Sequence, residues 1–131
     1  MKTTSQELGK QRGIDLKLRT KEFAMRVVRL YCALPKTTVA QVLGKQVLRA
    51  GTSVGAHYRE AMRARSDAEF VSKLEGALQE LEETEYWLEL LTESGIASSR
   101  RLEGLARECD ELIAIFTACT KNVKNRKASR A

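Results

Sequence analysis

The sequence predicts an all-α protein, an antiparallel up-down-up-down four-helix bundle. Apolar residues recur with the period of an α-helix in four stretches. The single proline lies between the first two stretches, and no stretch shows the alternating pattern of a strand or the signals of a hairpin. Connections of only a few residues make consecutive helices antiparallel neighbours. We expect the bundle over residues 18–125, a flexible arm over residues 1–17 and a basic tail over residues 126–131.

The first two predicted helices are separated by Pro35. We expect the first to begin near Thr20 as its N-cap and to end at the proline. We expect the second to begin at Thr37 or Thr38 and to extend to about Ala64. Apolar residues at steps of three and four define one face of each helix. They are Phe23, Val27, Leu30 and Leu34 in the first helix, and Val39, Leu43, Val47, Ala50, Val54, Tyr58 and Ala61 in the second.

The last two predicted helices carry heptads with clear start signals. Ser66 and Glu69 form a capping box at the start of the third helix. Gly95 is suited to the position after its end, and Ser98 or Ser99 caps the fourth helix. The two heptad series predict the core-facing residues. They are Phe70, Leu74, Ala77, Leu81, Thr84, Leu88 and Leu91 in the third helix, and Leu102, Leu105, Cys109, Leu112, Phe116, Cys119 and Val123 in the fourth.

Gly44, Gly51 and Gly55 lie together on one flank of the second predicted helix. A glycine inside a helix costs roughly 0.5–1 kcal/mol relative to alanine. Close packing of another backbone on this flank would offset that cost, and the backbone could come from a neighbouring helix or a neighbouring subunit. Aromatic residues beside the third heptad are expected in the core or at a subunit contact. The residues predicted for an oligomer interface are Gly51, Gly55, His57, Tyr58, Tyr86 and Trp87.

A basic face on the second helix is the best candidate for a binding surface. Lys45, Arg49, Arg59 and Arg63 fall within about 40° of one another at a helical step of 100°, with Arg65 just beyond. Arginine forks match the phosphates of RNA or DNA. Salt bridges to the acids of the third helix, within the bundle or across subunits, explain the same face equally well. Basic residues near the C-terminus form either a second phosphate-binding arm or a solubilising tail: Lys121, Lys124, Arg126, Lys127 and Arg130.

The distribution of charge leaves the same two alternatives open. The net charge is +6, yet residues 1–65 carry 14 Lys or Arg against 4 Asp or Glu, and residues 66–94 carry one lysine against nine acids. Such polarity suits an electrostatic partner, or helices and subunits that pair acidic face to basic face. No motif that reads bases is present, so binding to nucleic acid would depend on shape and charge.

The sequence predicts no catalytic, metal or cofactor site. A di-metal centre of the ferritin type needs a Glu-x-x-His motif on each of two helices, and the only histidine, His57, has no glutamate three residues before it. We expect His57 at the edge of the core or at an interface. Ser53 shares a helix side with His57, but Glu60 points away and one helix provides no oxyanion hole. We therefore expect no enzyme and no small-molecule substrate.

The cysteines and the hydropathy pattern bear on the compartment of the protein. Cys32, Cys109 and Cys119 have no close pairing motif and are predicted to be buried free thiols. No apolar run approaches the roughly 20 residues of a membrane span, and the first residues lack the apolar stretch of a signal peptide. We expect a cytoplasmic protein without a membrane partner.

The segment from Gln46 to Leu91 resembles the bacterial four-helix-bundle proteins encoded within intervening sequences of 23S ribosomal RNA genes, and the resemblance extends over about residues 20–120. The family has asparagine where this chain has His57, and many members have Glu-Gly where this chain has Glu60-Ala61. The matching positions are Gln46, Arg49, Ser53, Val54, Glu60, Ser66, Glu69, Phe70 and the run from Glu85 to Leu91.

The resemblance implies a homopentameric antiparallel bundle without enzymatic activity and with ribosomal RNA or another nucleic acid as partner. Two hypotheses follow. The first is an RNA-binding homo-oligomer that uses the basic face of the second helix. The second is a structural or protein-interaction scaffold in which the opposed charges only build the oligomer.

Overall fold

The computed structural model describes the backbone of residues 5–130 and the side chains of residues 16–126. It contains helices α1 (Ser5–Ala33), α2 (Thr38–Met62), α3 (Asp67–Glu93) and α4 (Ser99–Arg130), and no strand within the described residues. The prediction of an all-α protein with four helices is therefore confirmed. Among the described residues, none of the helices is both long enough and apolar enough to cross a membrane.

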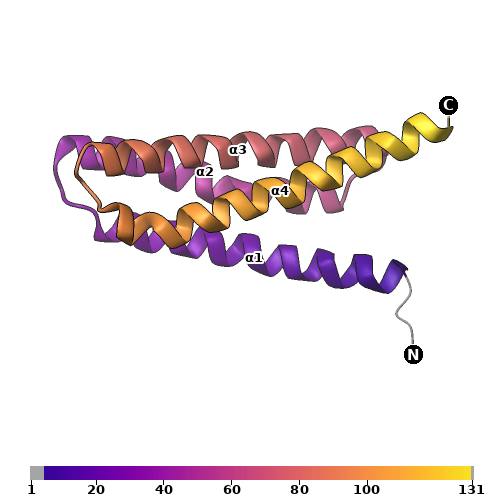
Figure 1. Ribbon diagram of the computed structural model, residues 1–131, viewed down its shortest axis with the longest axis horizontal. Coiled ribbons are helices and arrows are strands. Elements are labelled where there is room, and N and C mark those ends of the chain that lie inside the picture. Colours follow the sequence, from indigo (N-terminus) through magenta and orange to yellow (C-terminus); the bar gives the residue numbers. More distant parts are fainter. Residues whose placement is uncertain (1–4, 131) are drawn as a thin grey trace.

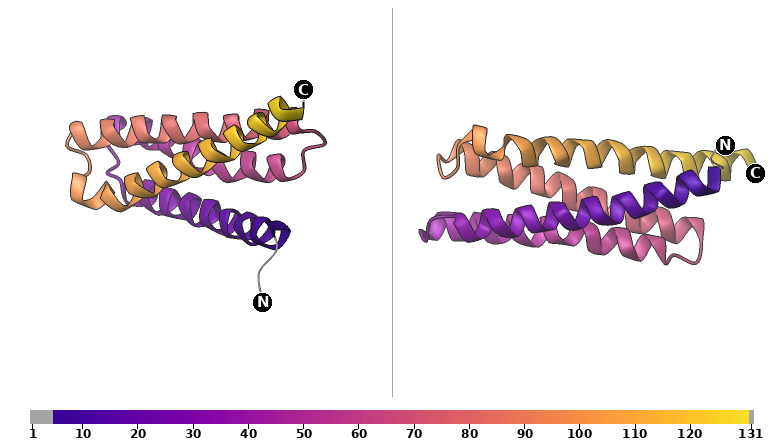
Figure 2. Two further views of the ribbon diagram at one scale, coloured as in Figure 1. Left: turned by 45° about the vertical axis from the view of Figure 1, so that its right-hand side comes forward. Right: turned by 90° about the horizontal axis from the view of Figure 1, so that it is seen from below.

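Figure 1 shows that consecutive helices reverse direction at short connections. Helix α2 contacts both α1 and α3, and α4 packs mainly on α3. Contact between α1 and α4 is the least extensive, and α1 diverges from α4 toward its N-terminal end in Figure 1 and in the left view of Figure 2. The end of the molecule that holds the α2–α3 connection is therefore more open than the end that holds the α1–α2 and α3–α4 connections.

The predicted capping residues of α2, α3 and α4 lie at the ends of these helices as expected. The Thr37 hydroxyl accepts a hydrogen bond from the Ala40 amide at 3.3 Å, and the Ser66 hydroxyl accepts one from the Glu69 amide at 3.1 Å. Ser98 acts in the same way at the start of α4. Gly95 has a φ of +76°, a conformation that favours glycine and that ends the turn after α3.

The predicted start of the first helix near Thr20 is wrong, because α1 begins at Ser5. Thr20 is fully buried inside the helix, and its hydroxyl donates a hydrogen bond to the Lys17 carbonyl at 3.2 Å. Leu16 is also buried on the same face, so the core extends below Phe23 by two turns. Residues 5–17 are thus helical, where a flexible arm was expected, and residues 126–130 continue α4, where a separate tail was expected.

The core is formed by the predicted apolar faces, except that the buried face of α2 is rotated about the helix axis relative to the prediction. Tyr58 of α2 stacks on Phe116 of α4 with ring centroids 5.7 Å apart and an interplanar angle of 7°. Val39 was predicted in the core but is 57% exposed. The buried face of α2 instead runs through Ala40 and Gly44, because α1 covers the glycine flank as well as the apolar face.

The glycine flank of α2 packs against α1 of the same chain. A Cβ atom on Gly51 would lie 2.7 Å from Val27 Cγ2, and one on Gly55 would lie 3.2 Å from the Thr20 hydroxyl. Gly51, Gly55 and Tyr58, which were predicted to lie at an oligomer interface, are buried within the single chain. Of the two backbones that the sequence left open, the neighbouring helix fills this flank.

Replacing Gly51 with alanine should lower the free energy of unfolding by about 1 kcal/mol. The new methyl overpacks against the buried, β-branched Val27, and this cost exceeds the gain in helix propensity. Gly104→Ala is the matched control, because the nearest atom to its new Cβ is the end of the flexible Arg26 side chain at 3.0 Å. That control should gain about 0.5–1 kcal/mol. Urea denaturation measures both, and a Gly51→Ala protein as stable as the parent would contradict this packing.

Candidate nucleic-acid interface

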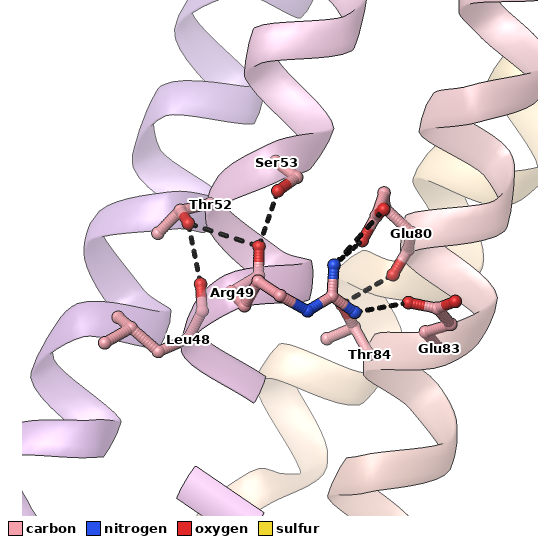
Figure 3. Close-up of polar contacts among 7 residues, drawn as sticks. All are labelled: Leu48, Arg49, Thr52, Ser53, Glu80, Glu83 and Thr84. Atoms are coloured by element: carbon pink, nitrogen blue, oxygen red, sulfur yellow. Dashed lines mark hydrogen bonds and ion pairs between the residues drawn. The ribbon is translucent and has the colours of Figure 1, made fainter. Parts of the chain in front are cut away.

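Arg49, at the centre of the predicted basic face, turns toward α3 of its own chain (Figure 3). Its Nη1 atom lies 3.2 Å from Glu80 Oε2, and its Nη2 atom lies 2.6 Å from Glu83 Oε2. The hydrogen bond to Glu83 is the main cause that raises the pKa of Arg49. Both terminal nitrogens of the guanidinium are thus directed at carboxylates, so Arg49 joins α2 to α3 and is poorly placed for phosphate.

The other cations of the basic face point to solvent. Lys45, Arg59, Arg63 and Arg65 are exposed. Within residues 16–126, none of their side chains lies within ion-pair distance of a carboxylate. The backbone amide of Arg65 donates to Glu69 Oε2 at 3.1 Å, which fixes the chain just before α3 and leaves the guanidinium outside. The predicted face is therefore divided into one arginine paired with α3 and four exposed cations that have no ion pair with a carboxylate of residues 16–126.

The basic C-terminal residues lie on the last turns of α4. Lys121 and Arg126 are exposed, whereas Lys124 Nζ lies 2.7 Å from Glu75 Oε1 of α3. Lys127 lies outside the residues whose side chains are described. The ion pair to Glu75 holds this part of α4 beside α3, close to the start of α3.

Arg65 and Arg126 line the same hollow of about 320 Å³, between the α2–α3 connection and the end of α4. Its wall also includes Met62, which is 50% exposed, and Phe70. The end of α2 and the end of α4 are far apart in the sequence, and the fold brings their arginines to one end of the molecule (Figure 1). In the sequence these two groups of basic residues are separate candidates, because no local pattern shows how α4 crosses α3.

His57 is half-buried at the contact between α2 and α3. A Cβ atom on Gly76 would lie 3.0 Å from His57 Nδ1, so the imidazole fills the space that this glycine leaves. Glu60 Oε2 lies 3.9 Å from Nδ1, closer than the sequence predicted but beyond hydrogen-bond distance. The Ser53 hydroxyl donates to the Arg49 carbonyl at 2.6 Å, so it has its own partner in the helix backbone. This geometry gives Ser53 and His57 structural roles.

Tyr86 and Trp87 form an aromatic corner on α3. Their rings meet edge to face with centroids 5.1 Å apart, and Tyr86 is 53% exposed. The Trp87 Nε1 atom is buried and has no hydrogen-bond acceptor among the described residues. The two rings line a shallow hollow of about 500 Å³ together with Arg49, Gln46 and Gln79, and with the acids Glu82 and Glu83. The acids make this corner a poor surface for phosphate.

The cysteines differ in their surroundings. Cys109 is buried, its thiol donates to the Leu81 carbonyl at 3.1 Å, and burial raises its pKa to about 12. Cys119 is half-buried. Cys32 is exposed, so the prediction that all three are buried is wrong for Cys32, which lies on the outer side of α1. All three are free thiols.

Comparison with known proteins identifies the family. A family model described as "23S rRNA-intervening sequence protein" matches residues 14–118. This chain belongs to that family. A crystal structure of a protein with unknown function from the S23 ribosomal protein family of Bacteroides thetaiotaomicron is 39% identical, with a TM-score of 0.78. The match covers 83% of this chain and 97% of that one. No curated protein matches. The resemblance seen in the sequence is confirmed.

Arg49→Gln should lower the free energy of unfolding by about 0.5–1 kcal/mol, the usual range for an ion pair with an exposed partner. High salt should reduce this loss, because ions screen exposed charges. Arg59→Gln is the matched control on the same helix, and its effect should be close to zero because Arg59 has no ion pair with a described carboxylate. Urea unfolding at low and high salt measures both variants. Equal losses in the two variants would show that the pairs with Glu80 and Glu83 contribute nothing.

Proposed function

We propose that this protein is a non-enzymatic RNA-binding accessory protein of the cytoplasm that works as a homo-oligomer of antiparallel up-down-up-down four-helix bundles. The RNA-binding surface is the exposed basic end: Arg59, Arg63 and Arg65 of the α2 end, with Lys121 and Arg126 of α4. Lys45 extends this surface along α2, and Arg49 is left out because its fork faces Glu80 and Glu83. The observation that carries the proposal is the hollow that Arg65 and Arg126 share.

Several cations without internal partners, gathered at one end, suit a polyanion. Each phosphate that a lysine or arginine neutralises releases counterions, so affinity comes from the number of contacts and falls with salt. The family description, which refers to 23S ribosomal RNA, favours RNA over DNA as the partner. The surface offers charge and shape but no group that reads bases, so we expect little preference for sequence.

The absence of catalysis is part of the proposal and is supported by the partners of the polar residues. Ser53 is bonded to the Arg49 carbonyl, and the His57 ring packs over Gly76. Within the described residues, no group of three His, Cys, Asp or Glu side chains could hold a metal ion. We propose no cofactor and no small-molecule substrate for this chain.

The homo-oligomer, a pentamer by the family resemblance, would form through the aromatic corner at Tyr86 and Trp87. A large aromatic ring that is half exposed, beside a buried indole N–H that lacks an acceptor, suits a subunit contact better than solvent. Gly51, Gly55 and Tyr58 take no part in this contact because α1 and α4 cover them.

Tyr86→Ala should weaken assembly, with a dissociation constant raised about thirtyfold, as expected for an aromatic residue at the centre of an interface. Sedimentation over a range of concentrations measures the change. Leu18→Ala is the control, because Leu18 is equally exposed at 56% but lies on α1 away from the corner. An unchanged mass distribution in Tyr86→Ala would show that the aromatic corner is not part of the subunit contact.

The alternative function is a scaffold whose charges only join helices or subunits. The pairs of Arg49 with Glu80 and Glu83, and of Lys73 with Glu60 at 3.1 Å, favour it, because they use opposite charges of α2 and α3 inside one chain. The exposed cations at the basic end are not explained by this alternative. The two functions therefore differ in what is expected of Arg59 and Arg63.

The double variant Arg59→Glu with Arg63→Glu should lower affinity for RNA at least tenfold. Loss of two phosphate contacts should also reduce the slope of log affinity against log salt by about 1.5. Titration of labelled RNA with nuclease-treated protein from 50 to 200 mM salt measures both quantities.

Arg100→Glu with Arg101→Glu is the matched control for this experiment. It makes the same change of charge on exposed residues, but at the start of α4, at the opposite end of the molecule (Figure 1). Equal losses in the two double variants would mean that only net charge matters. Failure of the parent protein to bind RNA at 50 mM salt would favour the scaffold.

A further inference from the structure

A hollow of about 750 Å³ lies between α3 and α4, close to the connection that joins them. Buried Leu88 and Leu102 contribute apolar surface to its wall. The charged residues around it are Glu85, Glu89, Glu93, Arg100, Glu103, Arg107 and Asp110. Acids therefore outnumber bases here, although the chain as a whole is basic.

Glu85 of α3 and Asp110 of α4 both line this hollow, with Glu85 half-buried and Asp110 exposed, and their carboxyl groups lie close enough for a hydrogen bond between the two side chains. Two ionised carboxylates offer only acceptors, so a hydrogen bond between them requires a proton on one of the two. The Glu85 Oε2 atom is buried and has no donor among the described side chains and amides. A proton held between the two carboxyl groups supplies the donor that the surroundings lack.

The charges that face the pair come from both helices and do not neutralise it. On α3, Glu82 and Glu89 add negative charge beside Glu85. On α4, Arg107 is directed at Glu103, with Nη2 3.0 Å from Oε1, and Arg100 is exposed at the rim. Cys109, next to Asp110, is an uncharged thiol bonded to the Leu81 carbonyl. Within residues 16–126, no lysine or arginine lies within ion-pair distance of Glu85 or Asp110.

The titration of Glu85 follows from these surroundings. The hydrogen bond that the protonated Glu85 carboxyl donates to Asp110 raises the pKa of Glu85 most, burial raises it further, and the charges of Asp110, Glu89 and Glu82 add to it, to about 7. Like charges in contact cannot both ionise at their ordinary pKa values. Glu85, beside Asp110, therefore changes its charge near neutral pH.

We propose that Glu85 and Asp110 share one proton and form a pH-sensitive contact between α3 and α4. While the proton is bound, the pair is a hydrogen bond that joins the two helices beside the hollow. When the proton is lost, two carboxylates face each other among Glu82 and Glu89, and their repulsion separates α3 from α4 at this point. The contact lies far from the basic end, so this device is independent of RNA binding.

The direction of the pH effect is fixed by linkage. The pKa of Glu85 rises from its ordinary 4.5 to about 7 on folding, so between these pH values the folded chain holds more protons than the unfolded chain. Stability must then fall as the pH rises through this range. This is opposite to the usual behaviour of a carboxylate in a salt bridge, whose stabilisation is lost as the pH falls.

The test compares Glu85→Gln with the parent protein by thermal unfolding at pH 5.5 and pH 8.5. The glutamine amide can donate to Asp110 at any pH, so it replaces the shared proton. Because pH 5.5 already lies within the range from 4.5 to about 7, we expect the variant to melt slightly above the parent at pH 5.5, and its advantage to be about 3 °C larger at pH 8.5. Asp110→Asn places the donor on the other helix and should give the same pattern, which guards against a folding defect peculiar to one variant.

Glu93→Gln is the matched control. It removes one negative charge from the wall of the same hollow but is not among the groups that shift Glu85. Its effect on the melting temperature should be the same at both pH values. Carboxyl carbon NMR of the parent protein gives a direct check, with a Glu85 midpoint expected near 7. A midpoint near the ordinary 4.5, or pH-independent effects of both Glu85→Gln and Asp110→Asn, would overturn the proposal.

Discussion

Helix α2 packs against α1 through a flank of glycines, and this close contact is the constraint on which the other contacts depend. Gly51 lies directly under Val27, and Gly55 lies under the buried Thr20. Without side chains on this flank, α1 approaches closely and covers it, which rotates the buried face of α2 away from Val39. The rotation determines which residues of α2 are left to contact α3. It places Arg49 opposite Glu80 and Glu83, and it places the His57 ring over Gly76.

The same packing sorts the charges of the chain into two classes. Cations at the contacts of α3 with α2 and α4 are paired, as Arg49, Lys73 and Lys124 are with their acids. Cations at the end of α2 lie beyond the acidic stretch of α3 and point to solvent. A partner of opposite charge can compete only for the second class, because binding the first would leave carboxylates without their counterions. The basic end is therefore the part of this surface that a polyanion can occupy at least cost.

The contact between α3 and α4 differs from the contact between α2 and α3 in how its charged side chains are neutralised. Apolar heptad residues meet along it, but Glu85 and Asp110 meet beside them without a cation. A proton takes the place that a lysine or arginine takes at the α2–α3 contact. Protons vary with pH whereas side-chain cations do not, so the two contacts respond differently to the solution.

The sequence by itself determined the four helices, their caps and most of the core, because these depend on period and on neighbours a few residues away. Ser66, Gly95 and the two heptad series illustrate this, and the family resemblance rested on the same positions. The start of α1 was missed because Thr20, which continues the helical spacing between Leu16 and Phe23, is polar and also suits an N-cap. Only the tertiary structure decided that α1 covers the glycine flank and that Arg49 pairs with acids of α3. It also decided that Arg65 and Arg126 line one hollow and that Glu85 lies beside Asp110. Each of these depends on the rotation and crossing of whole helices, which packing of the complete core sets and no local spacing records.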